Sequence, residues 1–427
     1  MNGQRHQSLL QDWRRYHWPF WPAVPLYPRG QRRTLRREIV PNAVWVFEQI
    51  QGIFYVVVPI RMTVVKLESG GLLVYAPVAP TPECLELLSE LIVKHGTVQH
   101  IIFPTISGLE HKVFVGPFAR QFPQATVWIL PQQWSFPVNL PLSWLGFPIG
   151  RTHVLPDDSR EPPFASQFDY ARPGVIELGT GRFEEVTFFD RRSRTLLLTD
   201  LVIAIPAEPP EIVQLDPFPL LFHARDTALD PLVDTPENRR KGWKRICLFA
   251  TYFRPGALEQ QIQWGQVLQR AWQAPDRSGK NFFGLFPFFW RSDWEASFEQ
   301  LWDQGRLFVA PVLQTLILNR APQATLKWAD RVVDWQFERI VPCHFQAPIQ
   351  ATADEFRQAF AFLNSGDMGS DVVHGNDLYE NVQCEPNQNQ GVRTNRVKAL
   401  PDQDLQLLRD LNKGLLRRGW ITPEALR

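Results

Sequence analysis

The chain has 427 residues, of which 44% are hydrophobic and 21% charged, and its formal net charge is +1. This composition supports a large buried core and excludes a chain that is disordered throughout. A net charge near zero also argues against a protein that binds nucleic acid through a basic face. No stretch reaches the roughly 18 consecutive apolar residues that a bilayer-spanning helix needs, so no transmembrane segment is expected.

The cysteines and the N-terminus indicate a reducing, cytosol-like compartment. The first residues show no apolar region followed by a small-residue cleavage site, so export is not expected. Widely spaced cysteines without a CxxC pair form neither a zinc ribbon nor a disulfide framework in so long a chain. The four are Cys84, Cys247, Cys343 and Cys384.

Residues 1–38 are rich in Pro, Trp and Arg and are predicted to form an extended arm. The first 40 residues carry eight Arg against one Asp and one Glu. The prolines around Trp18, Phe20 and Trp21 exclude a helix there. A basic arm with aromatic side chains favours an anionic surface or a protein partner, and peripheral contact with a membrane is one option.

From residue 39 the pattern predicts a layered α/β domain that extends to residue 364. Short runs of β-branched and aromatic residues predict strands at 39–49, 54–68, 71–77, 100–104, 126–131, 186–190, 195–203 and 339–344. Thr81 and Pro82 are suited to open a helix, and a second helix is expected near 113–122. Capping-box spacing occurs at Ser292 with Glu295 and at Thr352 with Glu355.

Three further segments have a different texture. Residues 206–336 are expected to be a mostly helical insertion between two core strands. Residues 365–400 are polar and rich in Gly and Asn, which is typical of a linker. Residues 401–427 predict a short amphipathic helix.

Four candidate site residues stand where a strand ends or a loop opens, which is where sites gather in α/β folds. Glu110 and His111 follow the strand at 100–104, Asp200 ends the strand TLLLT, and His344 ends RIVPC. Taken singly, a His at a strand end is more often a structural residue, and an Asp there is often a turn former.

The order of these elements resembles the metallo-β-lactamase superfamily, and more closely a domain-of-unknown-function family found in cyanobacteria and plastids. IRMTVVKLESGGLLVYAPVAP is similar to the superfamily's opening strands, and IIFPTISGLEHKVFVGPFARQFPQATVWILP takes the place of the segment that carries its HxHxDH motif. RSRTLLLTDLV and RIVPCHF place Asp200 and His344 at the bridging aspartate and the last histidine. The resemblance implies an αββα sandwich with a helical insertion, located in a cyanobacterial cytosol or a plastid stroma.

The departures from the family's motif concern its first metal. Thr105 and Ser107, or Ile106 and Gly108 in the other register, stand where the first two histidines belong. The stretch Gly179-Thr180-Gly181 stands where the third histidine of the first metal site belongs, and it contains no histidine. The ligands of the second metal remain as Glu110, His111, Asp200 and His344, so the resemblance implies one divalent ion, or none if the site is degenerate.

Two imidazoles and two carboxylates suit Zn²⁺ or Fe²⁺, with Mn²⁺ as a further option. Their rings must lie within about 8 Å of each other to share an ion. Two hypotheses follow. The protein is a single-metal hydrolase or oxidoreductase of unknown substrate, or it is a non-catalytic scaffold or interaction protein, which the resemblance would link to photosynthesis.

The run 281–290 concentrates aromatic residues on a backbone interrupted by Gly and Pro. Its plain interpretation is a buried strap over the core, because large exposed apolar patches are rare on monomers. Its functional interpretation is a pocket wall beside the metal, or a surface that meets lipid or protein. The expected pocket residues are Phe282, Phe283, Phe286, Phe288 and Trp290.

Overall fold

The computed structural model describes residues 27–28, 32–135, 139–179, 181–259, 261–364, 400, 402–419 and 421. The aromatic residues Trp18, Phe20 and Trp21 of the predicted arm lie outside these residues, as do Cys384 and nearly all of the predicted linker. The last four residues predicted for the arm belong to the first strand, which begins at Leu35.

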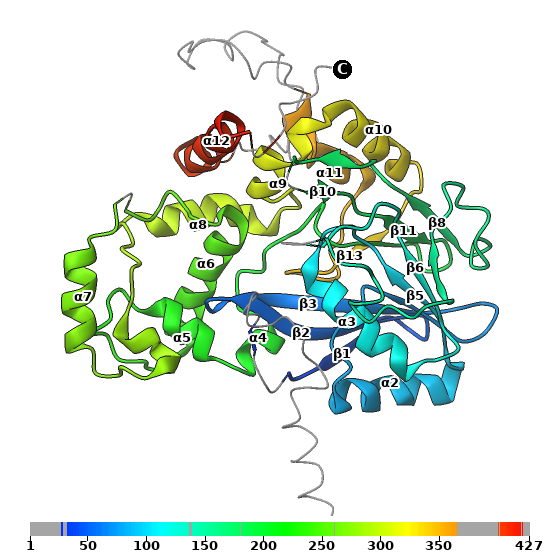
Figure 1. Ribbon diagram of the computed structural model, residues 1–427, viewed down its shortest axis with the longest axis horizontal. Coiled ribbons are helices and arrows are strands. Elements are labelled where there is room, and N and C mark those ends of the chain that lie inside the picture. The colour runs from blue at the N-terminus through cyan, green and yellow to red at the C-terminus, as the bar shows by residue number, and fades with distance from the viewer. Residues whose placement is uncertain are drawn as a thin grey trace, which may run out of the picture.

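Two β-sheets form the centre of the molecule (Figure 1). The first has seven strands in the order β1 to β7, antiparallel from β1 to β4 and parallel from β4 to β7. Its strands are β1 (Leu35–Val40), β2 (Val44–Ile53), β3 (Val56–Lys66), β4 (Leu72–Tyr75), β5 (Val98–Phe103), β6 (Thr126–Ile129) and β7 (Thr152–Val154).

The second sheet has the order β13-β12-β11-β8, and only its β12–β13 pair is parallel. Its strands are β8 (Phe168–Ala171), β11 (Thr187–Asp190), β12 (Thr195–Leu198) and β13 (Arg339–Pro342). A small separate ribbon joins β9 (Ile176–Glu177) to β10 (Arg182–Phe183). Strand β8 was not predicted, because the short run FDYA is broken by an aspartate.

Alternation along the strands sorts side chains into layers, because successive residues of a strand point to opposite faces. Val44 and Val46 face the core between the two sheets, whereas Trp45 and Phe47 face α2 and α3. In the second sheet, Leu197 faces the inter-sheet core while its two neighbours face the helices of the insertion. These layers confirm the predicted α/β class and the αββα sandwich.

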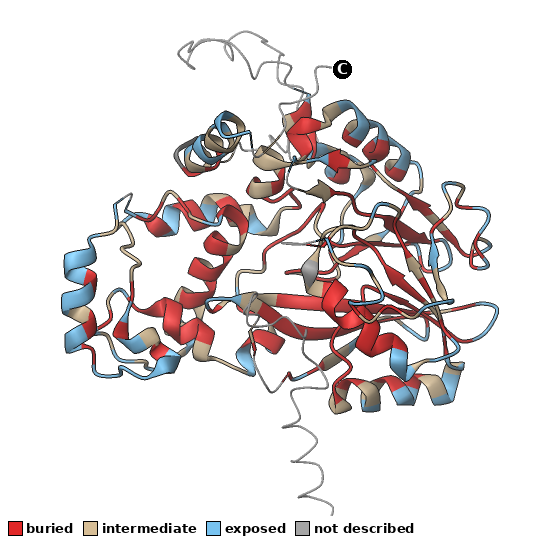
Figure 2. Ribbon diagram, in the orientation of Figure 1, coloured by how far each residue is buried: buried red, intermediate tan, exposed pale blue. Residues whose placement is uncertain are grey.

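Helices cover both outer faces, and Figure 2 shows most strands buried beneath them, whereas β1 and β7 are partly exposed. Thr81 caps α2 with Pro82 in its first turn, and Thr352 with Glu355 forms a complete capping box on α11, as predicted. The capping box predicted at Ser292 is wrong, because α8 begins at Trp294 after Asp293, without a side-chain cap.

The helices on the side of the first sheet are α2 (Pro82–His95) and α3 (Leu109–Gln121). Between β12 and β13 lie α4 (Glu211–Gln214), α5 (Phe218–Ala224), α6 (Pro236–Tyr252), α7 (Trp264–Gln273), η2 (Gly279–Gly284), α8 (Trp294–Trp302), η3 (Asp303–Gly305), α9 (Pro311–Leu316), η4 (Leu318–Arg320) and α10 (Pro322–Val333). After β13 come α11 (Ala353–Gln358), η5 (Ala361–Leu363) and α12 (Asp402–Arg417). None of the helices in the described part of the chain is long and apolar enough to cross a membrane.

Candidate metal centre

The four predicted ligands come together at one edge of the sandwich and are called here the His/carboxylate cluster. Glu110 and His111 lie in the first turn of α3, Asp200 follows β12 and His344 follows β13. Nε2 of His344 lies 2.9 Å from Oε2 of Glu110 and 3.2 Å from Oδ1 of Asp200. The two imidazole ring centroids are 6.4 Å apart, which lies inside the limit for a shared ion.

Backbone carbonyls orient both imidazoles of the cluster. Nδ1 of His111 donates to the carbonyl of Pro77 at 3.1 Å, and Nδ1 of His344 donates to the carbonyl of Pro59 at 2.9 Å. A carbonyl only accepts, so each Nδ1 carries a proton. Nε2 of His344 contacts both carboxylates, and Nε2 of His111 is the nitrogen left for a ligand. Metal-binding histidines are commonly held in this way, by a hydrogen bond from the nitrogen that does not bind the ion.

The two histidines differ in charge. Burial, reinforced by the positive charge of His344, lowers the pKa of His111 to about 4, so its ring is neutral near pH 7 and its Nε2 keeps a lone pair. Burial also opposes protonation of His344, but the carboxylates of Glu110 and Asp200 outweigh it and raise its pKa well above the ordinary value. Nε2 of His111 is buried and has no hydrogen-bond partner among the described residues.

The ligand types of the cluster, two imidazoles and two carboxylates, suit a divalent ion. In the structure, however, His344 forms ion pairs with Glu110 and Asp200. Among the residues that the structure describes, no three His, Cys, Asp or Glu side chains have a metal-holding arrangement. Two imidazoles on one tetrahedral ion have centroids about 5 Å apart, so the observed separation is about 1 Å too long. The proton on Nε2 of His344 lies between this nitrogen and the carboxylates of Glu110 and Asp200, where a bound metal ion would replace it.

Glu185 supports Asp200 and was not predicted from the sequence. Its buried carboxylate accepts hydrogen bonds from the backbone N–H groups of Thr199, Asp200 and Leu201, and so holds the turn that follows β12. Burial and the nearby Asp200 charge raise the pKa of Glu185 to about 7. The sequence signal was available: two consecutive glutamates stand directly before an apolar strand.

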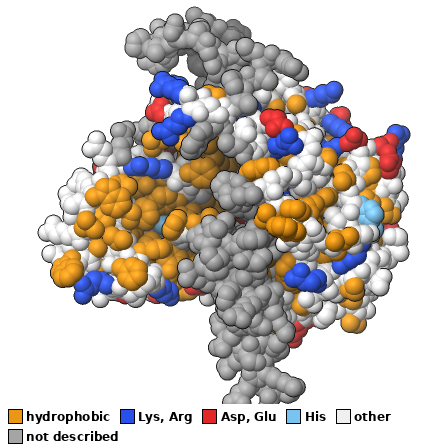
Figure 3. Space-filling model, in the orientation of Figure 1, with side chains coloured by type: hydrophobic (Ala, Val, Ile, Leu, Met, Phe, Trp, Pro, Cys, Tyr) orange, Lys and Arg blue, Asp and Glu red, His pale blue; other side chains and the backbone are white. Residues whose placement is uncertain are grey.

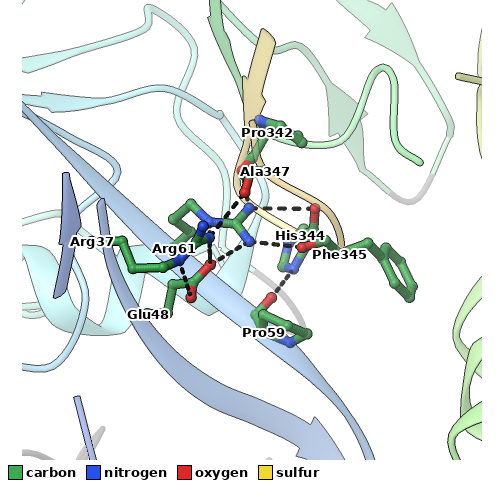
Figure 4. A network of polar contacts seen from close by, with 8 residues as sticks. All are labelled: Arg37, Glu48, Pro59, Arg61, Pro342, His344, Phe345 and Ala347. Atoms are coloured by element: carbon green, nitrogen blue, oxygen red, sulfur yellow. Dashed lines mark hydrogen bonds and ion pairs between the residues drawn. The ribbon is translucent and has the colours of Figure 1, made fainter. Parts of the chain in front are cut away.

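A buried ion pair holds the turn that carries His344 against the first sheet (Figure 4). The Arg61 guanidinium on β3 lies 2.7 Å from Oε1 of Glu48 and donates to the carbonyls of Pro342 and Phe345. Arg37 donates to the same Oε1 of Glu48 at 2.9 Å and to the carbonyl of Ala347. The network therefore fixes the backbone on both sides of His344.

The positions where the superfamily has its first metal hold no imidazole in this chain. Thr105 is buried and forms an isolated β-bridge with Glu185. His100 accepts a hydrogen bond from Trp128 Nε1 at 3.3 Å, which is a structural role. Cys343 is buried between the two sheets, and burial raises the pKa of its thiol well above the usual range.

The aromatic residues of the run 281–290 form a cluster of their own with α5, α6 and the β2–β3 turn. Phe286 contacts Phe222 and Phe288, and Trp290 contacts Phe249 and Trp294. None of the ring contacts among the described residues joins this run to the His/carboxylate cluster. That these residues line a pocket stays a prediction, and Phe283 itself is exposed.

Fold and site together define an αββα sandwich with a cluster of histidines and carboxylates at its strand ends. The chain matches the model of the domain of unknown function DUF4336 over residues 41–362, and it belongs to that family. The match spans all strands of both sheets except β1, and it includes all four cluster residues and the whole helical insertion. No curated protein was found to be similar in sequence.

Three solved structures are similar to the chain at low identity. A metallo-β-lactamase from Pontibacter korlensis is 13% identical with a TM-score of 0.34, covering 77% of this chain and 99% of its own. A metal-soaked flavodiiron core from Synechocystis sp. PCC6803 is 9% identical with a TM-score of 0.38, and the alignment covers 78% of this chain and 61% of the flavodiiron chain. A flavo di-iron protein variant from Thermotoga maritima is 9% identical with a TM-score of 0.34, and the alignment covers 78% of this chain and 61% of that protein.

Proposed function

We propose that the protein is a single-metal enzyme, a hydrolase or oxidoreductase, whose ion is bound by Glu110, His111, Asp200 and His344. One observation carries this proposal. Nε2 of His111 is buried without a partner while Nδ1 of the same ring is held by the carbonyl of Pro77. Leaving a buried polar atom unpaired costs about 1–3 kcal/mol, so an unpaired neutral nitrogen on a ring close to the carboxylates of Glu110 and Asp200 favours a ligand there.

Each side chain of the cluster would have a distinct role in binding the ion. His111 supplies a neutral nitrogen, His344 supplies a second one once its Nε2 proton is lost, Asp200 and Glu110 supply negative charge, and Glu185 holds the Asp200 turn in place. A divalent ion bound there supplies a Lewis acid that acidifies water or polarises a substrate. Two anionic ligands make such water less acidic than in an all-histidine site, where its pKa is about 7.

We do not favour the alternative of a non-catalytic scaffold. A scaffold has no need of a buried neutral imidazole beside two carboxylates, because apolar residues of similar size would fill the same space without desolvation cost. The three described cysteines, Cys84, Cys247 and Cys343, are buried free thiols, and we infer a reducing location such as a cytosol or plastid stroma.

Elemental analysis of untagged protein, loaded in turn with Zn²⁺, Fe²⁺ and Mn²⁺ and then dialysed, tests the proposal. We expect one ion per chain, lost in His111→Ala and in His344→Ala. His153→Ala is the matched control, because this imidazole is exposed and lies outside the cluster. Glu185→Gln should weaken metal binding by about 10–100-fold, the usual effect of removing a group that orients a ligand.

Two ions per chain would mean that a first-metal site exists despite its missing histidines. No bound ion, or an ion retained by both alanine variants, would overturn the proposal. The metal that binds most tightly then separates the two enzyme classes: iron favours oxidoreductase chemistry, and zinc favours hydrolysis.

A further inference from the structure

A group of large apolar side chains faces solvent on the lobe that carries α5, α6 and α7, where Figure 3 shows hydrophobic side chains gathered. Exposed clusters of this kind are rare on monomers and mark an interaction site. We call it the aromatic face. Its members are between 57% and 79% exposed, and they are Phe54, Trp264, Leu268, Trp272 and Phe283.

Two turns present one exposed ring each through strained backbone. Phe54 and Phe283 have φ angles of 52° and 57°, in the left-handed region that residues other than glycine avoid. The neighbours Tyr55 and Phe282 share this conformation, and their rings turn inward and meet at 5.4 Å. Each pair therefore anchors one ring in the protein and directs the other outward, and such strain is typical of functional sites.

Helix α7 adds a stripe of exposed apolar residues. Trp264, Leu268 and Trp272 recur every four residues and so lie on one side of the helix. Val267 and Ala271 are buried next to this stripe, and Ala271 packs against Gly284 at the end of η2. Only part of the helix's apolar surface is thus covered by the protein, and Figure 2 shows most of α7 exposed.

Three cationic side chains border the aromatic face without an acidic partner. Arg270 lies over Phe289, Arg277 over Trp272 and Lys280 over Phe218, at 5.4, 5.3 and 3.8 Å from the ring centroids. None of the three forms an ion pair within the part of the chain that the structure describes. The face therefore combines exposed Trp and Phe rings with unpaired positive charge.

From this combination we infer that the aromatic face binds the surface of an anionic lipid bilayer. Trp and Phe insert at the boundary between headgroups and acyl chains, and Lys and Arg beside them are attracted to anionic headgroups. A second copy of the chain fits less well, because a twofold interface would bring the three cations toward their own copies. The inference is independent of the proposed metal site and adds a location to it.

Co-sedimentation with vesicles tests the inference on the full-length, metal-free protein. One set contains equal parts of phosphatidylglycerol and phosphatidylcholine, and the other contains phosphatidylcholine alone. We expect binding to the anionic set, a blue shift of tryptophan fluorescence on binding, and weaker binding at high salt. Trp264→Ser/Leu268→Ser/Trp272→Ser should lower the affinity at least about tenfold, as should Arg270→Gln/Arg277→Gln/Lys280→Gln.

The matched control is Val93→Ser/Trp144→Ser/Ile149→Ser, which replaces three apolar residues that are at least 68% exposed, on α2 and on the loop over α3. It should bind vesicles as the unmodified protein does. All variants alter exposed residues, and circular dichroism checks that each is folded. No binding to anionic vesicles, or an equal loss in the control, would overturn the inference. So would a dimer in solution that the α7 variant converts to a monomer.

Discussion

Replacing Arg61 by methionine tests how the turn of His344 is held. Arg61 is 1% exposed and its partner Glu48 is 6% exposed, so the pair is shielded from solvent. Breaking a buried ion pair by removing one partner costs about 3–5 kcal/mol. Arg37 remains beside Glu48 and compensates part of its charge, so the expected loss for Arg61→Met is near the lower end, about 3 kcal/mol.

Arg37→Met is the matched control because it removes a cation from the same carboxylate. Arg37 is 42% exposed, and solvent screens its interaction, so its loss should cost about 0–1 kcal/mol. Urea unfolding followed by tryptophan fluorescence gives both values. Amide hydrogen exchange should also accelerate in residues 342–347 of the Arg61 variant, because two of their carbonyls lose a donor.

A double variant separates the ion pair from simple packing. Glu48→Gln together with Arg61→Met removes both charges, so it should cost less than the sum of the two single changes. The reasoning is refuted if Arg61→Met destabilises the protein no more than Arg37→Met does, or if the double variant is strictly additive.

Two further predictions concern the helical insertion. Burial lowers the pKa of His223 to about 3, so the neutral ring contributes stability above its unfolded pKa near 6.5, and this stability is lost as the pH falls below that value. His223→Gln should therefore reduce the loss of stability at acid pH in a series of thermal melts. The control His153→Gln changes an exposed imidazole and should leave that loss unchanged. Gly242→Ala places a methyl group 1.9 Å from the Leu220 carbonyl where α6 crosses α5, and should cost several kcal/mol or prevent folding. Gly265→Ala meets nothing within 4 Å in α7 and should be neutral or stabilising by about 0.5 kcal/mol, so equal effects at the two glycines would contradict the packing argument.

Local pattern was enough to predict most strands and the positions of the four cluster residues. Alternating runs such as 44–47 must turn successive side chains to opposite faces, so their burial in two layers follows from chemistry alone. Asp200 and His344 were recognisable because each follows the end of a strand, and Glu110 because it follows a strand through a short loop; the order of these elements, which resembles a known superfamily, set them apart from ordinary structural residues.

Interactions between residues far apart in the sequence could not be predicted. Glu48 and Arg61 looked like ordinary strand polar residues, and their role depends on a turn some 281 residues later in the chain than Arg61. Glu185 lies beneath Asp200 only because β11 and β12 pair. The aromatic run 281–290 was recognisable as unusual, but whether its rings turn inward or toward solvent depends on the fold of α5 to α7 around it. The sequence determines which side chains are available. Which of them are buried, and which charges pair with each other, is decided only when strands and helices far apart in the sequence pack together.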